Sequence, residues 1–181
     1  MNQPIHTISD KELISGFKQN PEKTFRLLLG KYKELVYFQC RRILIQHEDA
    51  DDATQNTFVK VWNNLSKFKG ESEFSTWLYR IAYNESLTQL KKQKKSLSET
   101  NEYDSGGVSS SDNMLSSDEI EKKLADAISI LPEKQRMVFH YRYYDDLSFK
   151  EISAIMGTSE GGLKANYHHA VTKIKEKLEI N

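Results

Sequence analysis

Apolar residues recur at every third or fourth position along most of this chain, a spacing that predicts helices and no strands. Ser9, with Glu12 three residues later, forms a capping box that should start the first helix. A long helix should follow Asn20-Pro21, because Asn caps helices well and Pro is tolerated at the first helical position. Its apolar stripe is typical of a core helix and consists of Phe25, Leu28, Leu29, Tyr32, Leu35, Val36, Cys40, Ile43 and Leu44.

A helix that starts near Glu48 has two unlike faces. The side chains expected to face inward are Ala50, Ala53, Thr57, Phe58, Val61 and Leu65. Those expected to face outward are Asp51, Asp52, Gln55, Asn56 and Val59. Neighbouring carboxylates can bind a divalent metal or act as an acid/base pair, but the sequence places no complete ligand set around them. We therefore expect neither a metal site nor a catalytic site in this helix.

A further helix begins near Ser72 and runs beyond Leu90. Aromatic side chains lie close to Arg80, and a cluster of four lysines follows, namely Lys91, Lys92, Lys94 and Lys95. Aromatic rings stack on unpaired bases while Lys and Arg bind phosphates, which is the combination that single-strand binding needs. The same composition fits a core helix with a solvated basic end, and this stretch alone leaves both interpretations open.

Two helices joined by a tight turn are predicted within residues 147–178. Ser148 and Glu151 form a second capping box, and Gly157 can adopt the left-handed conformation that ends the first of these helices. Ser159 can cap the second helix. The apolar face of that second helix consists of Leu163, Tyr167, Ala170, Val171, Ile174 and Leu178. Its opposite face consists of Gly161, Lys164, Ala165, His168 and Thr172.

This pair of helices has the pattern of a helix-turn-helix, whose second helix exposes small, basic and polar residues to DNA. An ordinary helical hairpin with a solvated outer face is the alternative. Gly161 and Gly162 bear on this choice, because each lowers the stability of a helix by about 1 kcal/mol relative to Ala. Two glycines in a first turn suggest close approach to a DNA backbone, although they also fit a frayed helix end.

Charge is distributed unevenly, although the net charge is zero. Residues 1–95 hold 16 Lys and Arg against 11 Asp and Glu, residues 96–121 hold seven acids and no Lys or Arg, and residues 122–181 hold ten basic and eight acidic residues. From 96 to 117 the chain is rich in Ser and acids and cannot bury enough apolar surface to fold. We therefore expect an all-α protein with two small helical domains, 1–95 and 118–181, joined by a flexible linker. The C-terminal domain would contain the helix-turn-helix.

Several function classes are disfavoured by the composition. No apolar run is long enough to span a bilayer and no signal-peptide pattern is present, so we expect no membrane insertion and a cytoplasmic protein. Cys40 is the single cysteine, which excludes an internal disulfide and suggests a buried thiol. His140, His168 and His169 have no metal-ligand companions at useful spacing. Without a convergent nucleophile, base or metal set, we expect no enzyme, no metal and no cofactor.

Four motifs occur in order along the chain. They are Asp49-Ala50-Asp51-Asp52 followed by Gln55, Phe58 and Trp62, then residues 74–84 (FSTWLYRIAYN), residues 131–136 (LPEKQR) and residues 159–164 (SEGGLK). Together they resemble the bacterial RNA polymerase sigma factors of the extracytoplasmic-function (ECF) type. The resemblance covers nearly everything from Asp10 to Leu178.

For the N-terminal domain, the resemblance implies contacts with polymerase and with the −10 promoter element. The outward face formed by Asp51, Asp52, Gln55, Asn56 and Val59 would dock on the polymerase clamp helices. Trp77, Arg80 and Asn84 match the segment that opens the −10 element, with Asn84 in the loop that receives a flipped base. The phosphates would be held by Lys91, Lys92, Lys94 and Lys95.

For the C-terminal domain, the resemblance implies that the recognition helix reads the −35 element in the major groove. Lys164, Ala165 and His168 would be its readers. Ser159, Gly161 and Thr172 would lie at the same DNA-binding surface. The acidic linker resembles the family segment that threads the polymerase.

This chain also departs from the family pattern. Lys91 and Lys95 stand where the family often has Arg, and Asn166 and His169 stand where it usually has Arg. Lysine lacks the bidentate geometry of arginine, so these changes alter the phosphate contacts. The promoter sequence therefore cannot be carried over from the family.

The resulting hypothesis is a sigma factor that binds core RNA polymerase, recognises the −35 and −10 elements of promoter DNA and helps to open the duplex. The alternative is a stand-alone helix-turn-helix regulator, which should carry a dimerisation helix or a ligand pocket. The sequence contains a clear signal for neither. It leaves open whether an anti-sigma factor also binds.

Overall fold

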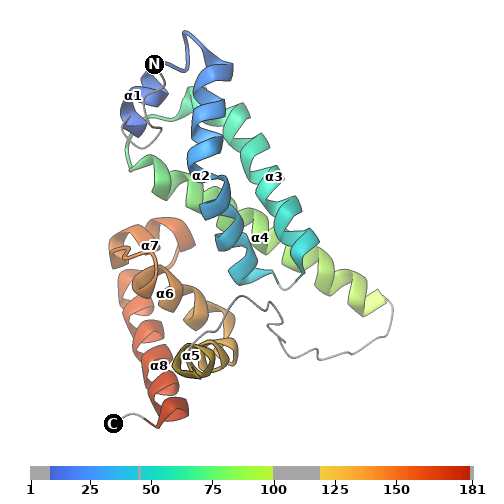
Figure 1. Ribbon diagram of the computed structural model, residues 1–181, viewed down its shortest axis with the longest axis vertical. Helices are drawn as coiled ribbons and strands as arrows, with labels where there is room; N and C mark the ends of the chain where they lie inside the picture. Colours follow the sequence, from blue (N-terminus) through green and yellow to red (C-terminus); the bar gives the residue numbers. More distant parts are fainter. Residues whose placement is uncertain (1–8, 45, 100–118, 180–181) are drawn as a thin grey trace. The chain divides into compact units, whose positions relative to one another are not determined.

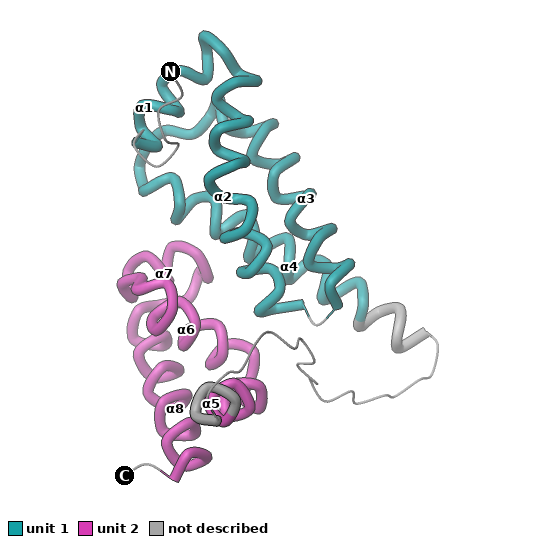
Figure 2. The backbone as a smooth tube through the Cα atoms, in the orientation of Figure 1, with its two compact units in different colours: residues 1–100 teal, residues 101–181 magenta. Residues whose placement is uncertain are grey.

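The computed structural model describes residues 9–44, 46–99 and 119–179 (Figure 1). All regular secondary structure in these residues is helical. The chain divides into two compact units, Met1–Thr100 and Asn101–Asn181 (Figure 2). The all-α prediction is therefore confirmed for the described residues.

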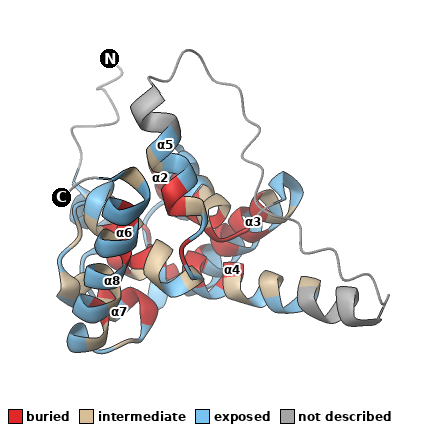
Figure 3. Ribbon diagram, turned by 90° about the horizontal axis from the view of Figure 1, so that it is seen from below, coloured by how far each residue is buried: buried red, intermediate tan, exposed pale blue. Residues whose placement is uncertain are grey.

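The first unit consists of α1 (Asp10–Ser15), α2 (Pro21–Ile43), α3 (His47–Asn64), the 3₁₀ helix η2 (Leu65–Lys67) and α4 (Phe74–Glu99). Helices α2, α3 and α4 pack against one another, and buried residues gather where they meet (Figure 3). The most deeply buried side chains of this core include Leu28, Val36, Cys40, Leu44, Val61, Leu65 and Leu78. Burial raises the pKa of the Cys40 thiol, in keeping with the buried thiol that the sequence predicts.

The predicted starts of α1 and α2 are confirmed, whereas α3 starts at His47, one residue before the expected Glu48, and α4 at Phe74, two residues after the expected Ser72. Ser9 and Glu12 form both bonds of the capping box, and the Asn20 side chain accepts a hydrogen bond from the backbone N–H of Lys23. The carboxylate of Asp10 then ties α1 to α2, because it accepts bonds from Lys31 at 2.6 Å and from the Tyr32 hydroxyl.

Two expectations about the first unit need correction or extension. Leu35, expected in the core stripe, is 46% exposed. Helical spacing shows which residues share a face, but the packing partners decide how much of that face is covered. Helix α4 continues to Glu99, beyond the boundary expected at Lys95, since extending a formed helix costs little. The rest of the expected linker, 100–117, lies outside the described residues.

The second unit consists of α5 (Glu119–Ser129), α6 (Glu133–Tyr143), α7 (Phe149–Met156) and α8 (Glu160–Leu178). Helix α8 packs against each of the other three. The apolar face predicted for α8 is buried or half-buried, with Ala170 and Ile174 in a cluster that also contains Ala127, Ile128, Leu131 and Phe139.

The turn between α7 and α8 forms as the sequence predicts. Ser148 and Glu151 make both bonds of their capping box, and Gly157 ends α7 with a left-handed φ of 65°. The Ser159 side chain accepts a hydrogen bond from the backbone N–H of Gly162 and so caps α8. The predicted helix-turn-helix is therefore present.

Candidate nucleic-acid interface

One face of α4 brings together the residues expected at the −10 element. Arg80, Asn84 and Lys91 are exposed and follow half-buried Trp77 at helical spacing. Lys92 is exposed beside them. An aromatic ring, an amide and several cations thus form one stripe along a helix, which suits a nucleic-acid strand. Lys94 and Lys95 belong to α4, but their side chains lie outside the described residues.

The loop that the family resemblance implied for Asn84 is wrong, and the helix predicted from apolar spacing over this stretch is confirmed. The family resemblance implied a loop, whereas Asn84 lies in the middle of α4 with buried Tyr83 and Glu85 on either side. Packing of these neighbours into the core determines the backbone conformation here and overrides the weak helix propensity of Asn. Asn84 therefore presents its amide from a rigid helix.

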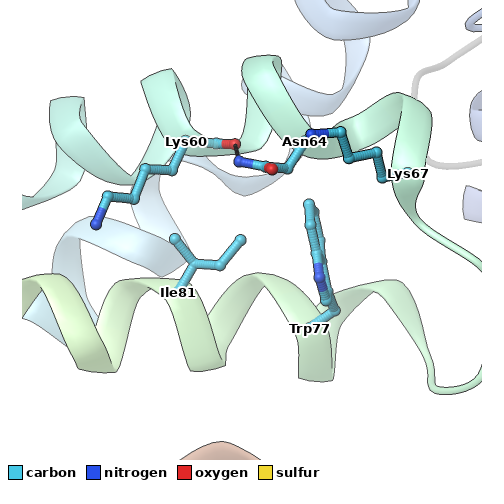
Figure 4. A pocket seen from close by; sticks show the side chains of 5 residues that line it. All are labelled: Lys60, Asn64, Lys67, Trp77 and Ile81. Atoms are coloured by element: carbon cyan, nitrogen blue, oxygen red, sulfur yellow. Dashed lines mark hydrogen bonds between the residues drawn. The ribbon is translucent and has the colours of Figure 1, made fainter.

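A shallow pocket of about 260 Å³ lies beside Trp77 (Figure 4). Its lining residues are Lys60, Asn64, Lys67, Trp77 and Ile81. Figure 4 shows the Trp77 ring and Ile81 rising from α4 toward Asn64 on α3. The ring centroid of Phe68 is 5.2 Å from that of Trp77, which supports the indole from the loop side.

Lys60, Asn64 and Lys67 were not among the predicted site residues. Lys60 also forms an ion pair with the buried Glu85 of α4, so this lysine is tied across the helix interface. No sequence signal links the three to Trp77, because only the packing of α3 on α4 brings them together.

The outward face predicted for α3 is present. Asp52, Gln55, Asn56 and Val59 are exposed and Asp51 is half-exposed, with Val59 at 58% exposure despite its apolar side chain. This face continues into a groove of about 390 Å³ between α2 and α3. The groove is lined by Lys33, Glu34, Tyr37, Phe38, His47, Asp51 and Thr54.

Phe38 is the functional candidate on this face that sequence reasoning missed. It is 55% exposed and lines the groove next to Asp51. A large exposed aromatic that lines a groove marks a surface suited to a protein partner. The available signal was its position, since Phe38 lies two residues after Val36 and therefore off the core stripe.

The outer face of α8 is as predicted. Ser159, Gly161, Lys164, Ala165, His168 and Thr172 are all exposed. A Cβ atom added to Gly161 would meet nothing within 4 Å, so the fold itself does not require this glycine. A Cβ added to Gly162 would lie 3.3 Å from the capping Ser159 Oγ, so the packing of the helix cap favours a glycine at position 162.

A half-buried aromatic ring extends this face onto α6 and α7. The Phe149 centroid lies 5.4 Å from the Arg142 guanidinium carbon and 5.9 Å from Lys164 Nζ. The cation–π contacts with Phe149 place the positive charges of Arg142 and Lys164 together at one edge of the recognition helix, α8. Sequence analysis missed Arg142 and Phe149, because the spacing of Phe149 from Ile152 is that of a core residue.

Within the described ranges, no cluster of three or more His, Cys, Asp or Glu side chains is placed to hold a metal ion. None of the helices in those ranges combines the length and apolarity needed to cross a membrane.

Comparison with known proteins matches each unit to a different part of one family. Residues 28–96 match Sigma-70 region 2, and residues 121–174 match Sigma-70, region 4. The ECF RNA polymerase sigma-E factor of Escherichia coli K12 is 31% identical over 183 residues, covering 95% of both chains. The sigma-E factor of Haemophilus influenzae is also 31% identical and covers 95% of this chain and 96% of its own.

The chain belongs to the ECF RNA polymerase sigma factors.

Solved sigma factors share the fold. The sigma factor RpoE of Bartonella quintana, in complex with the anti-sigma factor NepR, matches with a TM-score of 0.75 and 21% identity, covering 88% of this chain and 99% of that one. CnrH, in complex with the cytosolic domain of CnrY, matches with a TM-score of 0.67 and 20% identity, covering 94% and 97%.

As an ECF sigma factor, the protein recognises promoters for RNA polymerase. The family predicted from the four motifs is therefore confirmed. Nothing in the comparisons favours the stand-alone regulator over the sigma factor.

Proposed function

We propose that this sigma factor divides its work among three surfaces: the outer face of α3 binds core RNA polymerase, α4 binds the −10 element, and α8 reads the −35 element. The observation that carries the proposal is that each Sigma-70 region holds its own exposed face of nucleic-acid-binding composition. The first is the stripe on α4 and the second is the outer face of α8.

At the −10 element, the pocket beside Trp77 takes the unstacked base, in place of the loop first expected around Asn84. Taking a base out of the duplex costs a few kcal/mol, which stacking on a ring and hydrogen bonds to the base edge offset. Trp77 supplies the ring and Asn64 an exposed amide at the pocket. Arg80 and Asn84 follow the strand along α4, and Lys91 and Lys92, with Lys94 and Lys95, neutralise its phosphates.

At the −35 element, α8 enters the major groove with Lys164, Ala165 and His168 toward the bases or the backbone. Gly161 allows the backbone of α8 to approach closely, and Ser159 and Thr172 lie at the edges of the contact. The cations of Arg142 and Lys164, both held by the Phe149 ring, add phosphate contacts at one side of the groove.

At the polymerase, the contact face consists of Asp51, Asp52, Gln55, Asn56 and Val59. The groove that contains Phe38 adds apolar area to this polar face. The RpoE and CnrH structures described above were solved in complex with the anti-sigma factor NepR and with the cytosolic domain of CnrY, respectively. An anti-sigma factor is accordingly the regulatory partner that we expect for this chain, in competition with polymerase.

The domain plan follows from the same proposal, with the N-terminal domain extended to residue 99 because α4 continues to Glu99, the linker at 100–117 and the C-terminal domain at 118–181. The acidic linker would lie along a polymerase channel built for nucleic acid, where its charge is favourable. The protein would act in the cytoplasm and without catalytic chemistry of its own, since the polymerase performs the reaction.

The test is reconstitution with core RNA polymerase on a promoter that responds to overexpression of this chain. Permanganate reactivity of unpaired thymines should appear only when the chain and core polymerase are both present. Trp77→Ala should abolish that reactivity while leaving co-purification with polymerase intact. Val59→Asp should instead weaken co-purification with polymerase, and its loss of promoter opening should be recovered when core polymerase is added in excess. Loss of both properties in both variants would contradict the division of surfaces.

A further inference from the structure

The carboxylate of Asp49 joins two helices of the first unit. Asp49 lies in the first turn of α3, and its two oxygens accept hydrogen bonds from two side chains of α4. The Gln89 amide donates to Oδ1 at 2.6 Å, and the Gln93 amide donates to Oδ2. Hydrogen bonds to a charged acceptor are stronger than those between neutral groups. One carboxylate thus holds two successive turns of α4.

The Asp49 side chain bonds to α4 and does not cap its own helix, α3. A carboxylate at the third helical position commonly reaches back to bond the N-cap backbone. Helix α3 has no side-chain cap at Gln46, and the Asp49 oxygens are instead occupied by α4. The adjacent Glu48 is exposed and has no hydrogen bond or ion pair with any described residue.

The contact lies where the buried stripe of α4 ends. Leu78, Ala82 and Ser86 are fully buried, and the same helical spacing continues into half-buried Gln89 and Gln93. Among the described side chains of α4, no buried residue follows Ser86. The last turns therefore have no fully buried side chain among those described, so the bonds to Asp49 add to the contacts of the half-buried Leu87 and Leu90. The same turns carry the exposed lysines.

We propose that Asp49 is a positioning residue for promoter binding. Its carboxylate keeps the C-terminal half of α4 on α3, so that Lys91 and Lys92 stay in line with Arg80 and Asn84. This inference rests on the proposed role of α4 at the −10 element. Because Asp51 follows in the same helix, the contact also connects the polymerase-binding face to the DNA-binding stripe.

The first experiment needs neither polymerase nor DNA. Hydrogen exchange of the backbone amides 90–93 is measured in the wild-type chain, in Asp49→Ala and in Glu48→Ala, which removes the same charge from the same turn. Exchange should rise roughly tenfold or more in Asp49→Ala, since a hydrogen bond to a charged group is lost, and should not change in Glu48→Ala. Adding Gln89→Ala and Gln93→Ala to Asp49→Ala should cause little further change, because the partners share one interaction.

The second experiment uses the holoenzyme. Asp49→Ala should bind core polymerase as the wild type does but open the promoter several-fold less, with a smaller salt dependence because phosphate contacts are lost. A protein that is merely less stable would lose both properties together. The matched variant Glu48→Ala should retain both.

The outcomes separate the two proposals. Unchanged exchange in Asp49→Ala, or equal effects of Asp49→Ala and Glu48→Ala on opening, would overturn the role of Asp49 while the proposed function stood. An equal loss of polymerase binding and opening would also overturn it, because Asp49 would then act in docking or folding. A wild-type holoenzyme that opens no promoter would overturn the proposed function and the positioning role with it.

Discussion

At the scale of the residue, a substitution of Asn84 should affect DNA binding without affecting folding. Its side chain is exposed on α4 and bonds to no described residue. Asn84→Ala should keep or slightly raise the melting temperature, because Ala has the higher helix propensity. It should nevertheless reduce promoter opening by the holoenzyme, scored by permanganate reactivity. Unchanged opening, or a collapsed fold, would contradict a role for Asn84 in promoter binding.

The two glycines at the start of α8 allow a matched comparison. Gly161→Ala adds a Cβ into open space and should leave stability unchanged or raise it by up to about 1 kcal/mol. Gly162→Ala places a Cβ 3.3 Å from Ser159 Oγ, so a weakened cap of about 1 kcal/mol offsets the gain in helix propensity, and this variant should be less stable than Gly161→Ala. Thermal unfolding of both variants measures this difference.

Only the DNA assay tests whether Gly161 approaches a backbone. Holoenzyme with Gly161→Ala should bind a −35-dependent promoter more weakly, although the variant is at least as stable as the wild type. If binding equals that of the wild type, the glycine only loosens the end of the helix, and the proposed close approach of α8 to the DNA backbone is wrong.

At the scale of the element, the capping box of α7 makes the stability of the second unit depend on pH in the acidic range. The Glu151 carboxylate accepts hydrogen bonds from the Ser148 hydroxyl at 2.6 Å and from the Ser148 backbone N–H at 2.8 Å. These bonds hold the pKa of Glu151 below its ordinary value of 4.5. The folded carboxyl therefore stays charged at a pH where the unfolded one is already protonated.

This shift stabilises the fold above the unfolded pKa, and the stabilisation disappears as the pH falls through the lower, folded pKa. Glu151→Gln removes the titration, so its melting temperature should fall less between about pH 7 and about pH 3 than that of the wild type. The difference should be small, because Glu151 is only partly buried and solvent screens its interactions. Circular dichroism at the two pH values provides the measurement, and an identical fall in both proteins would contradict the prediction.

At the scale of the whole molecule, the charge distribution predicts weak DNA binding by the free protein. Residues 1–95 carry a net charge of +5 and residues 122–181 carry +2, so few phosphates can be neutralised. The block 96–121, at −7, should repel the duplex. Polymerase would fix the spacing of the two DNA-binding faces and so raise the effective concentration of the second contact.

The measurement is a titration of one promoter fragment, with free protein and with holoenzyme, at the same physiological salt. The free protein should bind much more weakly and with little sequence preference. Tight, sequence-specific binding by the free protein would favour a stand-alone regulator.

The sequence by itself determined the helices, the starts of those that have a capping side chain, and the family. Ser9, Asn20, Ser148 and Ser159 could be recognised as caps because each bonds to a backbone N–H only three residues away. Such local interactions depend on neighbouring residues alone and are therefore visible in a short stretch of sequence. Helical spacing likewise placed Val59 and Lys164 outward, since faces follow from the 3.6-residue period.

Tertiary structure alone decided which faces are covered and which distant residues meet. Leu35 has the spacing of a core residue but is exposed. The carboxylate of Asp49 bonds side chains 40 and 44 positions away. Periodicity describes one helix at a time, whereas these contacts depend on how α3 packs on α4. That packing is a property of all the core side chains together, and no single motif encodes it.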